Sequence, residues 1–196
     1  MRLGDKMNNI VDSMKKELMI TVEKHKYLKD YDFWNEHIKY VVENAIMLAK
    51  KYSADVEIVE LSALLHDIAL SSNFGPRDEH HIHGAKLAEK LLNKYGYDRE
   101  KIEKVKRCIL NHRDNTSAKT TKEEICVADA DIMSHFDNIP MLFSKAYLIK
   151  GLSHSQGVNY VKNTLMKDYE ELSADTKILY KDRYEDIMKV VFGNNS

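Results

Sequence analysis

The stretch from Glu60 to Leu70 constrains the fold more than any other part of the chain. It reads Glu-Leu-Ser-Ala-Leu-Leu-His-Asp-Ile-Ala-Leu, with apolar residues on nearly every side of a helix. An exposed helix would show a polar stripe at the helical period, so we expect this one to be buried. Burying an unpaired carboxylate is very costly, and Asp67 therefore needs a cation or hydrogen-bond donors. His66 and Asp67 are candidate metal ligands, although a core histidine bonded to a carbonyl would give the same two-residue pattern.

Composition favours helices around this buried stretch. The chain has 196 residues, only 7 Gly and 2 Pro, and a hydrophobic content of 43%. Such a chain can bury a substantial core in one domain, and its scarcity of helix-breaking residues favours an all-α fold. We therefore expect a single-domain helical bundle over residues 1–196. Its metal-site core should span about 33–136, with the terminal helices covering the core and pocket.

Charge and cysteine content narrow the class of protein. The formal net charge is -1, from 30 basic and 31 acidic residues, so no strong electrostatic field favours the binding of nucleic acid or of an anionic membrane. Cys108 and Cys126 lack zinc-site or redox spacing, which favours a reduced, cytoplasmic protein. Residues 1–20 lack the apolar run of a signal peptide, and no stretch is apolar for long enough to cross a bilayer. No sequence feature indicates the oligomeric state.

Apolar spacings of three and four predict a series of helices. Residues 53–55 should cap the helix that ends at His66-Asp67, and the Gly- and Pro-containing stretch 71–79 should be a loop beside that pair. Asp98 should cap a helix that reaches His112, and a capping box at 121–124 should start the next. The other predicted helices cover residues 6–26, 34–52, 80–95, 141–150, 156–172 and 175–192.

Further histidines lie at the ends of these helices. His37 precedes the apolar row of the second predicted helix, and His112 extends the apolar row of another by one step. His80, His81 and His83 open a helix, and such a cluster can direct one or two imidazoles into a neighbouring site. Each lone histidine could equally be a core or capping residue. The cluster could equally be a solvated metal site.

Two carboxylates lie among apolar residues later in the chain. Asp129 and Asp131 are about 200° apart around a helix, given roughly 100° per residue. At most one of them should therefore face a given metal. The helical wheel does not choose between them, because both flank the same apolar face.

In order and spacing, these residues resemble the HD-domain superfamily of metal-dependent phosphohydrolases. Leu64-Leu65-His66-Asp67-Ile68 resembles the family's His-Asp core, and the segment from His80 to Ala85 is similar to its His-x-x-x-Gly-Ala segment. Residues 109–113 resemble the segment that bears another histidine. Asp129-Ala130-Asp131 is similar to the Asp-Ala-Asp of small single-domain bacterial members, whose second aspartate is a ligand. Ala69 stands where many relatives have Gly.

The resemblance implies a ligand set and a chemistry. One metal would be held by His37, His66, Asp67 and Asp131, while His80 and His112 would add a second, with Asp67 as the bridge. His81 and His83 remain alternatives to His80, and Asp129 to Asp131. Mixed nitrogen and oxygen donors suit Mn, Fe, Ni, Co or Mg. His66 and Asp67 would be catalytic through a metal-activated water.

We therefore expect hydrolysis of a phosphate ester or phosphoanhydride, in a nucleotide or a related small molecule. Arg77, Lys86 and Arg113 lie near the ligand segments and could bind phosphate oxygens, although charged residues beside a loop are usually solvated. One alternative is a regulatory module that binds metal or nucleotide without catalysis. A weaker one is oxygenase chemistry at two irons, as in some relatives.

Overall fold

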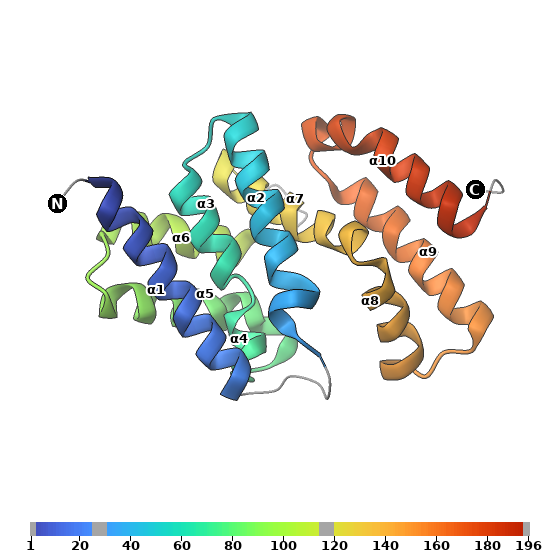
Figure 1. Ribbon diagram of the computed structural model, residues 1–196, viewed down its shortest axis with the longest axis horizontal. Helices are drawn as coiled ribbons and strands as arrows, with labels where there is room; N and C mark the ends of the chain where they lie inside the picture. Colours follow the sequence, from blue (N-terminus) through green and yellow to red (C-terminus); the bar gives the residue numbers. More distant parts are fainter. Residues whose placement is uncertain (1–2, 25–30, 114–119, 194–196) are drawn as a thin grey trace. The chain divides into compact units, whose positions relative to one another are not determined.

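The computed structural model describes residues 3–24, 31–113 and 120–193, which contain helices and no strand (Figure 1). The all-α prediction is confirmed. The chain divides into two compact units, residues 1–131 and 132–196. The single domain over residues 1–196, with terminal helices covering its core and pocket, stays a prediction.

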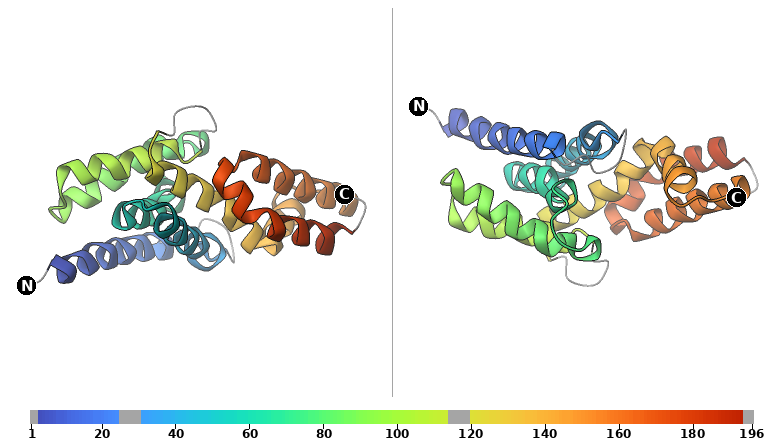
Figure 2. Two further views of the ribbon diagram at one scale, coloured as in Figure 1. Left: turned by 90° about the horizontal axis from the view of Figure 1, so that it is seen from above. Right: turned by 90° about the horizontal axis from the view of Figure 1, so that it is seen from below.

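In the first unit, one short helix lies among three others. Helix α3 packs against α1, α2 and α6, and the neighbouring α5 and α6 lie side by side along their length (Figures 1 and 2). The elements are α1 (Leu3–Lys24), the π-helix η1 (Trp34–Ile38), α2 (Lys39–Tyr52), α3 (Val56–Leu65), α4 (Ile68–Ser71), the 3-10 helix η2 (Arg77–Glu79), α5 (His80–Lys94) and α6 (Arg99–Asn111).

Helix α3 begins and ends as the sequence predicts. The side chain of Asp55 accepts hydrogen bonds from the backbone N–H groups of Glu57 and Ile58, at 3.1 and 3.3 Å. Such a cap satisfies donors that have no partner within the helix. The helix is buried on nearly all sides and stops at Leu65, and Asp67 leaves helical geometry with φ -107° and ψ 18°. The His-Asp pair therefore lies where the chain turns from α3 into α4.

Three local features differ from the simple sequence pattern. The helix predicted over 34–52 begins with the π-helical turn η1. The predicted loop 71–79 contains the 3-10 helix η2. Before α7 (Lys122–Asp137), half of the capping box forms: the Thr121 hydroxyl accepts from the Glu124 N–H at 3.3 Å, and the Glu124 carboxylate accepts from the Thr120 N–H. Residues 25 and 26 of the first predicted helix lie outside the described residues.

The second unit consists of helices around their own apolar core. It contains α8 (Ile139–Ser144), the π-helix η3 (Lys145–Ile149), α9 (His154–Glu171) and α10 (Ala174–Phe192). Helix α9 packs against α8, η3 and α10, and Leu142, Val161 and Leu165 are buried. An ion pair joins His135 Nδ1 to Asp168 Oδ2 at 2.8 Å within this unit. Over the residues that the structure describes, no helix is long and apolar enough to cross a membrane.

Candidate metal centre

Six of the predicted ligands converge within the first unit. They come from five parts of the fold: η1, the end of α3, which supplies two of them, the start of α5, the end of α6, and α7. All four histidines and Asp67 are buried, while Asp131 is half-buried. The six are His37, His66, Asp67, His80, His112 and Asp131.

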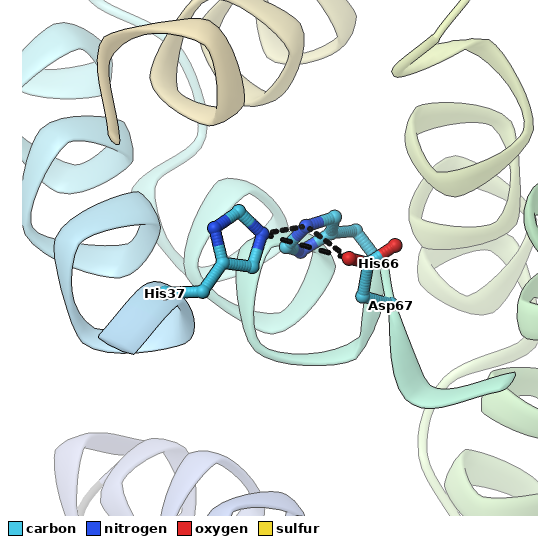
Figure 3. Close-up of side chains that lie close together, drawn as sticks. All are labelled: His37, His66 and Asp67. Atoms are coloured by element: carbon cyan, nitrogen blue, oxygen red, sulfur yellow. Dashed lines mark hydrogen bonds and ion pairs between the residues drawn. The ribbon is translucent and has the colours of Figure 1, made fainter. Parts of the chain in front are cut away.

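One half of the cluster joins η1 to the end of α3. Nε2 of His37 lies 3.2 Å from Nε2 of His66 (Figure 3). Oδ2 of Asp67 lies 3.5 Å from His37 Nε2 and 3.6 Å from His66 Nε2. Oδ1 of Asp131 faces the same two nitrogens at 3.3 and 3.6 Å. Two nitrogens and two carboxylate oxygens thus surround one point.

The other half of the cluster faces the second carboxylate oxygen of Asp67, Oδ1. Nε2 of His80 and Nε2 of His112 are 3.3 Å apart. Oδ1 of Asp67 lies 3.1 Å from the first and 3.8 Å from the second. The single carboxylate of Asp67 therefore faces one histidine pair with each of its oxygens.

Backbone carbonyls fix the tautomer of three of these rings. Nδ1 lies 2.8 Å from the Ala63 carbonyl oxygen in His66, 2.7 Å from the Arg77 oxygen in His80, and 2.6 Å from the Ile109 oxygen in His112. A carbonyl oxygen only accepts, so each Nδ1 carries a proton and donates it. In the neutral ring, the lone pair is then left on Nε2, which faces the cluster. Metal-bound histidines are usually oriented by such hydrogen bonds.

This arrangement fits a bound cation. Nε2 of His80 and Nε2 of His112 are both acceptors in the neutral rings, so they cannot hydrogen-bond to each other at 3.3 Å. A proton or a metal ion must lie among these lone pairs and the buried carboxylates, because facing acceptors repel. The imidazole nitrogens and carboxylate oxygens suit divalent first-row transition metals.

In the absence of a metal, protons supply the positive charge among the facing nitrogens and carboxylates. Burial lowers the pKa of His37, but the carboxylates of Asp131 and Asp67 outweigh burial and raise it to about 10. Burial raises the pKa values of Asp67 and Asp131, yet the facing histidines hold both well below the ordinary value.

The two neighbouring histidines differ in their titration. The pKa of His66 is raised, because the carboxylates of Asp67 and Asp131 outweigh burial. Burial and the charge of His66 lower the pKa of His112 to about 4. His112 is thus held neutral, as a metal ligand must be.

Gly84 allows α5 to approach the cluster closely. A Cβ at this position would lie 3.1 Å from the backbone oxygen of His66 and 3.4 Å from a side-chain carbon of Ile109. His80 lies one turn before Gly84, on the same face of the helix. The close approach of the two backbones therefore sets the position of the His80 ring.

The structure separates the alternatives that the sequence left open. Among the described residues, Asp131 and His80 lie in the cluster, whereas Asp129, His81 and His83 are not among its metal-binding groups. Asp129 is buried elsewhere on α7. The His81 ring contacts that of His80 edge-on, and His83 pairs with Glu79 at 3.4 Å and with the ring of Phe74. His83 therefore holds the loop before α5.

The three candidate phosphate-binding residues are placed differently. Arg77 orients His80 through its backbone oxygen, and Nη1 of Arg113 lies 3.4 Å from Nδ1 of His80. Lys86 is exposed and lies nearly two turns after His80 along α5. The structure therefore places the two arginines, but not the lysine, against a ligand of the cluster.

Tyr31 is near the cluster, although no feature of the sequence indicated it. Burial and the charges of Asp67, Glu36 and Asp131 raise the pKa of its phenol. The ring centroids of Tyr31 and Phe33 are 5.7 Å apart, and those of Phe33 and His37 are 6.0 Å apart, both in edge-on contact. Tyr31 lies in a short polar break between predicted helices, where no periodic pattern indicates a direction.

Comparison with known proteins identifies the family. The pattern of the HD domain family matches residues 35–135, which is more than half of the chain. An uncharacterised protein of Clostridium beijerinckii is 32% identical over 97 residues, which are 47% of this chain and 62% of that protein. The match thus spans less than two thirds of the relative's length.

Two solved structures show the same fold. The crystal structure of YpgQ from Bacillus subtilis has a TM-score of 0.67 and 19% identity, with 94% of this chain and 93% of that one covered. A predicted HD superfamily hydrolase from an uncultured Thermotogales bacterium has a TM-score of 0.53 and 22% identity, with 87% and 91% covered. Together with the matched residues 35–135, which contain every residue of the cluster, the family is established: the chain belongs to the HD domain family.

Proposed function

We propose that this protein is a metal-dependent phosphohydrolase that cleaves a phosphate ester or phosphoanhydride of a nucleotide or a related small molecule. The observation that carries the proposal is the placement of two histidine pairs against opposite oxygens of Asp67. This arrangement offers two adjacent cation positions with one shared carboxylate. Membership in the HD domain family and the likeness to a predicted HD superfamily hydrolase support the same reading.

The residues of the cluster divide into two sets. His37, His66 and Asp131 would hold one divalent ion with Oδ2 of Asp67, and His80 and His112 would hold a second with Oδ1. Bound there, the metal would polarise a phosphoryl oxygen and lower the pKa of a water molecule. Mn, Fe, Co, Ni or Mg all accept this donor set.

The chain itself supplies orientation and charge. The Nδ1 hydrogen bonds of His66, His80 and His112 keep the three Nε2 lone pairs directed into the cluster. The carboxylates of Asp67 and Asp131 are ionised at neutral pH, because the pKa of each is held well below the ordinary value. The cluster is therefore prepared for a cation without large rearrangement.

The test compares metal binding with turnover. The purified protein is stripped of metal, loaded with Mn²⁺ and assayed with a generic phosphodiester and a panel of nucleotides. We expect metal-dependent release of a phosphate product, and its loss in His66→Ala and Asp67→Ala variants. His154→Ala, an exposed histidine of the second unit, is the matched control and should keep full activity.

A protein that binds metal and turns over no phosphate compound would contradict the proposal. It would instead indicate a module that binds metal or nucleotide without catalysis.

A further inference from the structure

Helix α7 carries a buried carboxylate outside the metal cluster. Glu124 lies in the first turn of α7, and its side chain is 1% exposed. Its Oε1 lies 2.7 Å from Nη2 of Arg107 on α6, and its Oε2 accepts a hydrogen bond from the backbone N–H of Thr120 at 2.8 Å. Nη2 of Arg107 also donates to the Thr120 hydroxyl at 2.7 Å. The three residues thus form a closed ring of polar contacts between α6 and the start of α7.

The charge of Arg107 offsets the burial of Glu124. Among the described residues, Oε1 of Glu124 is buried without a hydrogen-bond partner, so its attraction to the guanidinium compensates for the water it has lost. Such a pair adds little net stability, because taking a carboxylate out of water costs much of what the attraction returns. It can instead fix the register of two helices, since any other register would leave the buried charge unpaired.

Polar contacts of this kind hold the first turn of α7. Helices α5 and α6 lie side by side and α3 packs against α6, but no closely approaching pair of helices among the described residues includes α7. Besides the pair at Glu124, Oε1 of Glu123 accepts from the backbone N–H of Asp55 at 2.9 Å. Nζ of Lys122 donates to the carbonyl oxygen of Tyr52, at the end of α2, at 2.8 Å. The start of α7 is therefore tied by side chains to α2, α3 and α6.

The position of this first turn determines where Asp131 lies. Asp131 is on the same face of α7 as Glu124, two turns or about 10 Å further along. Arg107 precedes His112 on α6 by five residues, which is about 8 Å. Ligand atoms of Asp131, His112 and His66 lie within 4.8 Å of one another. A shift of α7 along α6 would therefore carry the Asp131 carboxylate away from these histidines.

We propose that Glu124 is a positioning residue of the metal centre, because its ion pair with Arg107 sets the register of α7 against α6 and thereby the place of Asp131. The inference rests on the metal centre of the proposed function and adds a group that acts on it from outside. Glu124 acts through Asp131 and not on the metal. Loss of the pair should therefore weaken the ion at His37 and His66.

Three variants separate the position of α7 from the stability of the fold. Arg107→Gln leaves the Glu124 carboxylate buried without its cation, whereas Glu124→Gln removes the buried charge. The double variant removes both charges, so its free energy of unfolding should recover relative to Arg107→Gln. The ion pair that fixes the register is absent from all three. We therefore expect Mn²⁺ to bind about threefold to thirtyfold more weakly at one of the two positions in each.

Metal binding is measured without turnover. Metal-free protein is titrated with Mn²⁺ by calorimetry, at a temperature where circular dichroism shows each variant to be folded. The electron paramagnetic resonance spectrum of the loaded protein reports the geometry around Mn²⁺, and we expect it to change in all three variants. Urea denaturation of the metal-free protein gives the free energy of unfolding.

Two controls assign the effect. Arg99→Gln removes the same charge from an exposed position in the first turn of α6, and it should keep the Mn²⁺ affinity and the spectrum of the unmodified protein. Adding Arg107→Gln to Asp131→Asn should weaken Mn²⁺ binding by less than about twofold further, because the carboxylate through which the pair acts is already gone.

Two results would overturn the proposal. The first is unmodified Mn²⁺ affinity and an unmodified spectrum in the double variant, which would show that the ion pair serves stability alone. The second is a full additional loss of affinity when Arg107→Gln is added to Asp131→Asn, which would show that the pair does not act through Asp131. Mn²⁺ binding that depends on the pair, without hydrolysis of any phosphate compound, would instead contradict the proposed function and leave the positioning role standing.

Discussion

Nε2 of His80 lies 3.1 Å from Oδ1 of Asp67, while Oδ2 of the same carboxylate faces His37 and His66 on its other side. Asp67 thus pairs with histidines of both halves of the cluster, whereas Oδ1 of Asp131 lies 3.3 and 3.6 Å from the Nε2 atoms of His37 and His66, and a carboxylate oxygen of Asp131 lies within 4.8 Å of a ring nitrogen of His112. This asymmetry distinguishes the two carboxylates experimentally.

Replacing each carboxylate by its amide should give different metal stoichiometries. Asp67→Asn removes the charge that both cation positions share, so we expect loss of both ions and a fall in activity of at least about 100-fold. Asp131→Asn should weaken the binding of the ion at His37 and His66 and leave the ion at His80 and His112 bound. Metal analysis after gel filtration measures both. Equal stoichiometry in the two variants would argue against Asp67 as the shared ligand.

The histidine cluster at the start of α5 offers a matched pair. His80→Gln should lower the stoichiometry by one ion per chain, because its Nε2 faces Asp67 and His112. His83→Gln should leave metal content unchanged, since His83 pairs with Glu79. The two variants differ by three positions in one helix and are compared by metal analysis and isothermal titration with Mn²⁺. A loss of metal confined to His83→Gln would reverse the assignment.

Gly84→Ala should act on the His80 half through the backbone. The added methyl group would lie 3.1 Å from the His66 carbonyl oxygen, so α5 must move outward and take His80 with it. We expect the free energy of unfolding to fall by about 1–3 kcal/mol. The ion at His80 and His112 should bind more weakly, and the ion at His37 and His66 should be less affected. Urea denaturation and metal titration measure the two effects. An unchanged second site would show that α5 does not set the position of His80.

Stability without metal should depend on pH through the histidines. The pKa of His37 is raised from its ordinary 6.5 to about 10, so its protonation favours the folded state. That contribution is complete below pH 6.5 and is lost as the pH rises toward 10. His66 acts in the same direction.

Other groups of the cluster make the free energy of unfolding depend on pH in the opposite direction. The pKa of His112 is lowered to about 4, so its contribution is present above pH 6.5 and is lost as the pH falls toward 4. Asp67 and Asp131 also lose their contributions in acid, below the ordinary value of 3.8. We therefore expect metal-free protein to be most stable near pH 6.5 and to weaken above it.

Bound metal should reverse the trend above pH 6.5, because protons compete with the metal for the same nitrogens. Denaturation midpoints from pH 5 to 9, with and without Mn²⁺, measure this difference. His37→Gln should flatten the metal-free decline, whereas His154→Gln should preserve it. A metal-free midpoint that rises steadily to pH 9 would be incompatible with protons shared in the cluster.

Much of the fold could be predicted from the sequence by itself. The apolar run around Leu61, Leu64 and Leu65 required burial, and apolar periodicity with capping residues such as Asp55 and Asp98 set most helix boundaries. These features are local, because each depends on neighbours within a few residues. The sequence also supplied the ligand candidates, because histidines at helix ends and carboxylates among apolar residues stand out, and the resemblance to HD-domain proteins indicated which six form the set.

Only the tertiary structure decided which candidates meet. The helical wheel of α7 left Asp129 and Asp131 open, and the tertiary structure brings Asp131 of α7 to His37 and His66. His80 was equivalent to His81 and His83 until Gly84 brought α5 against the His66 carbonyl. The approach of the Arg77 backbone oxygen and of the Arg113 guanidinium to Nδ1 of His80 likewise depends on tertiary packing. Helical periodicity gives the direction of a side chain around its own axis, whereas the facing helix is set by long-range packing.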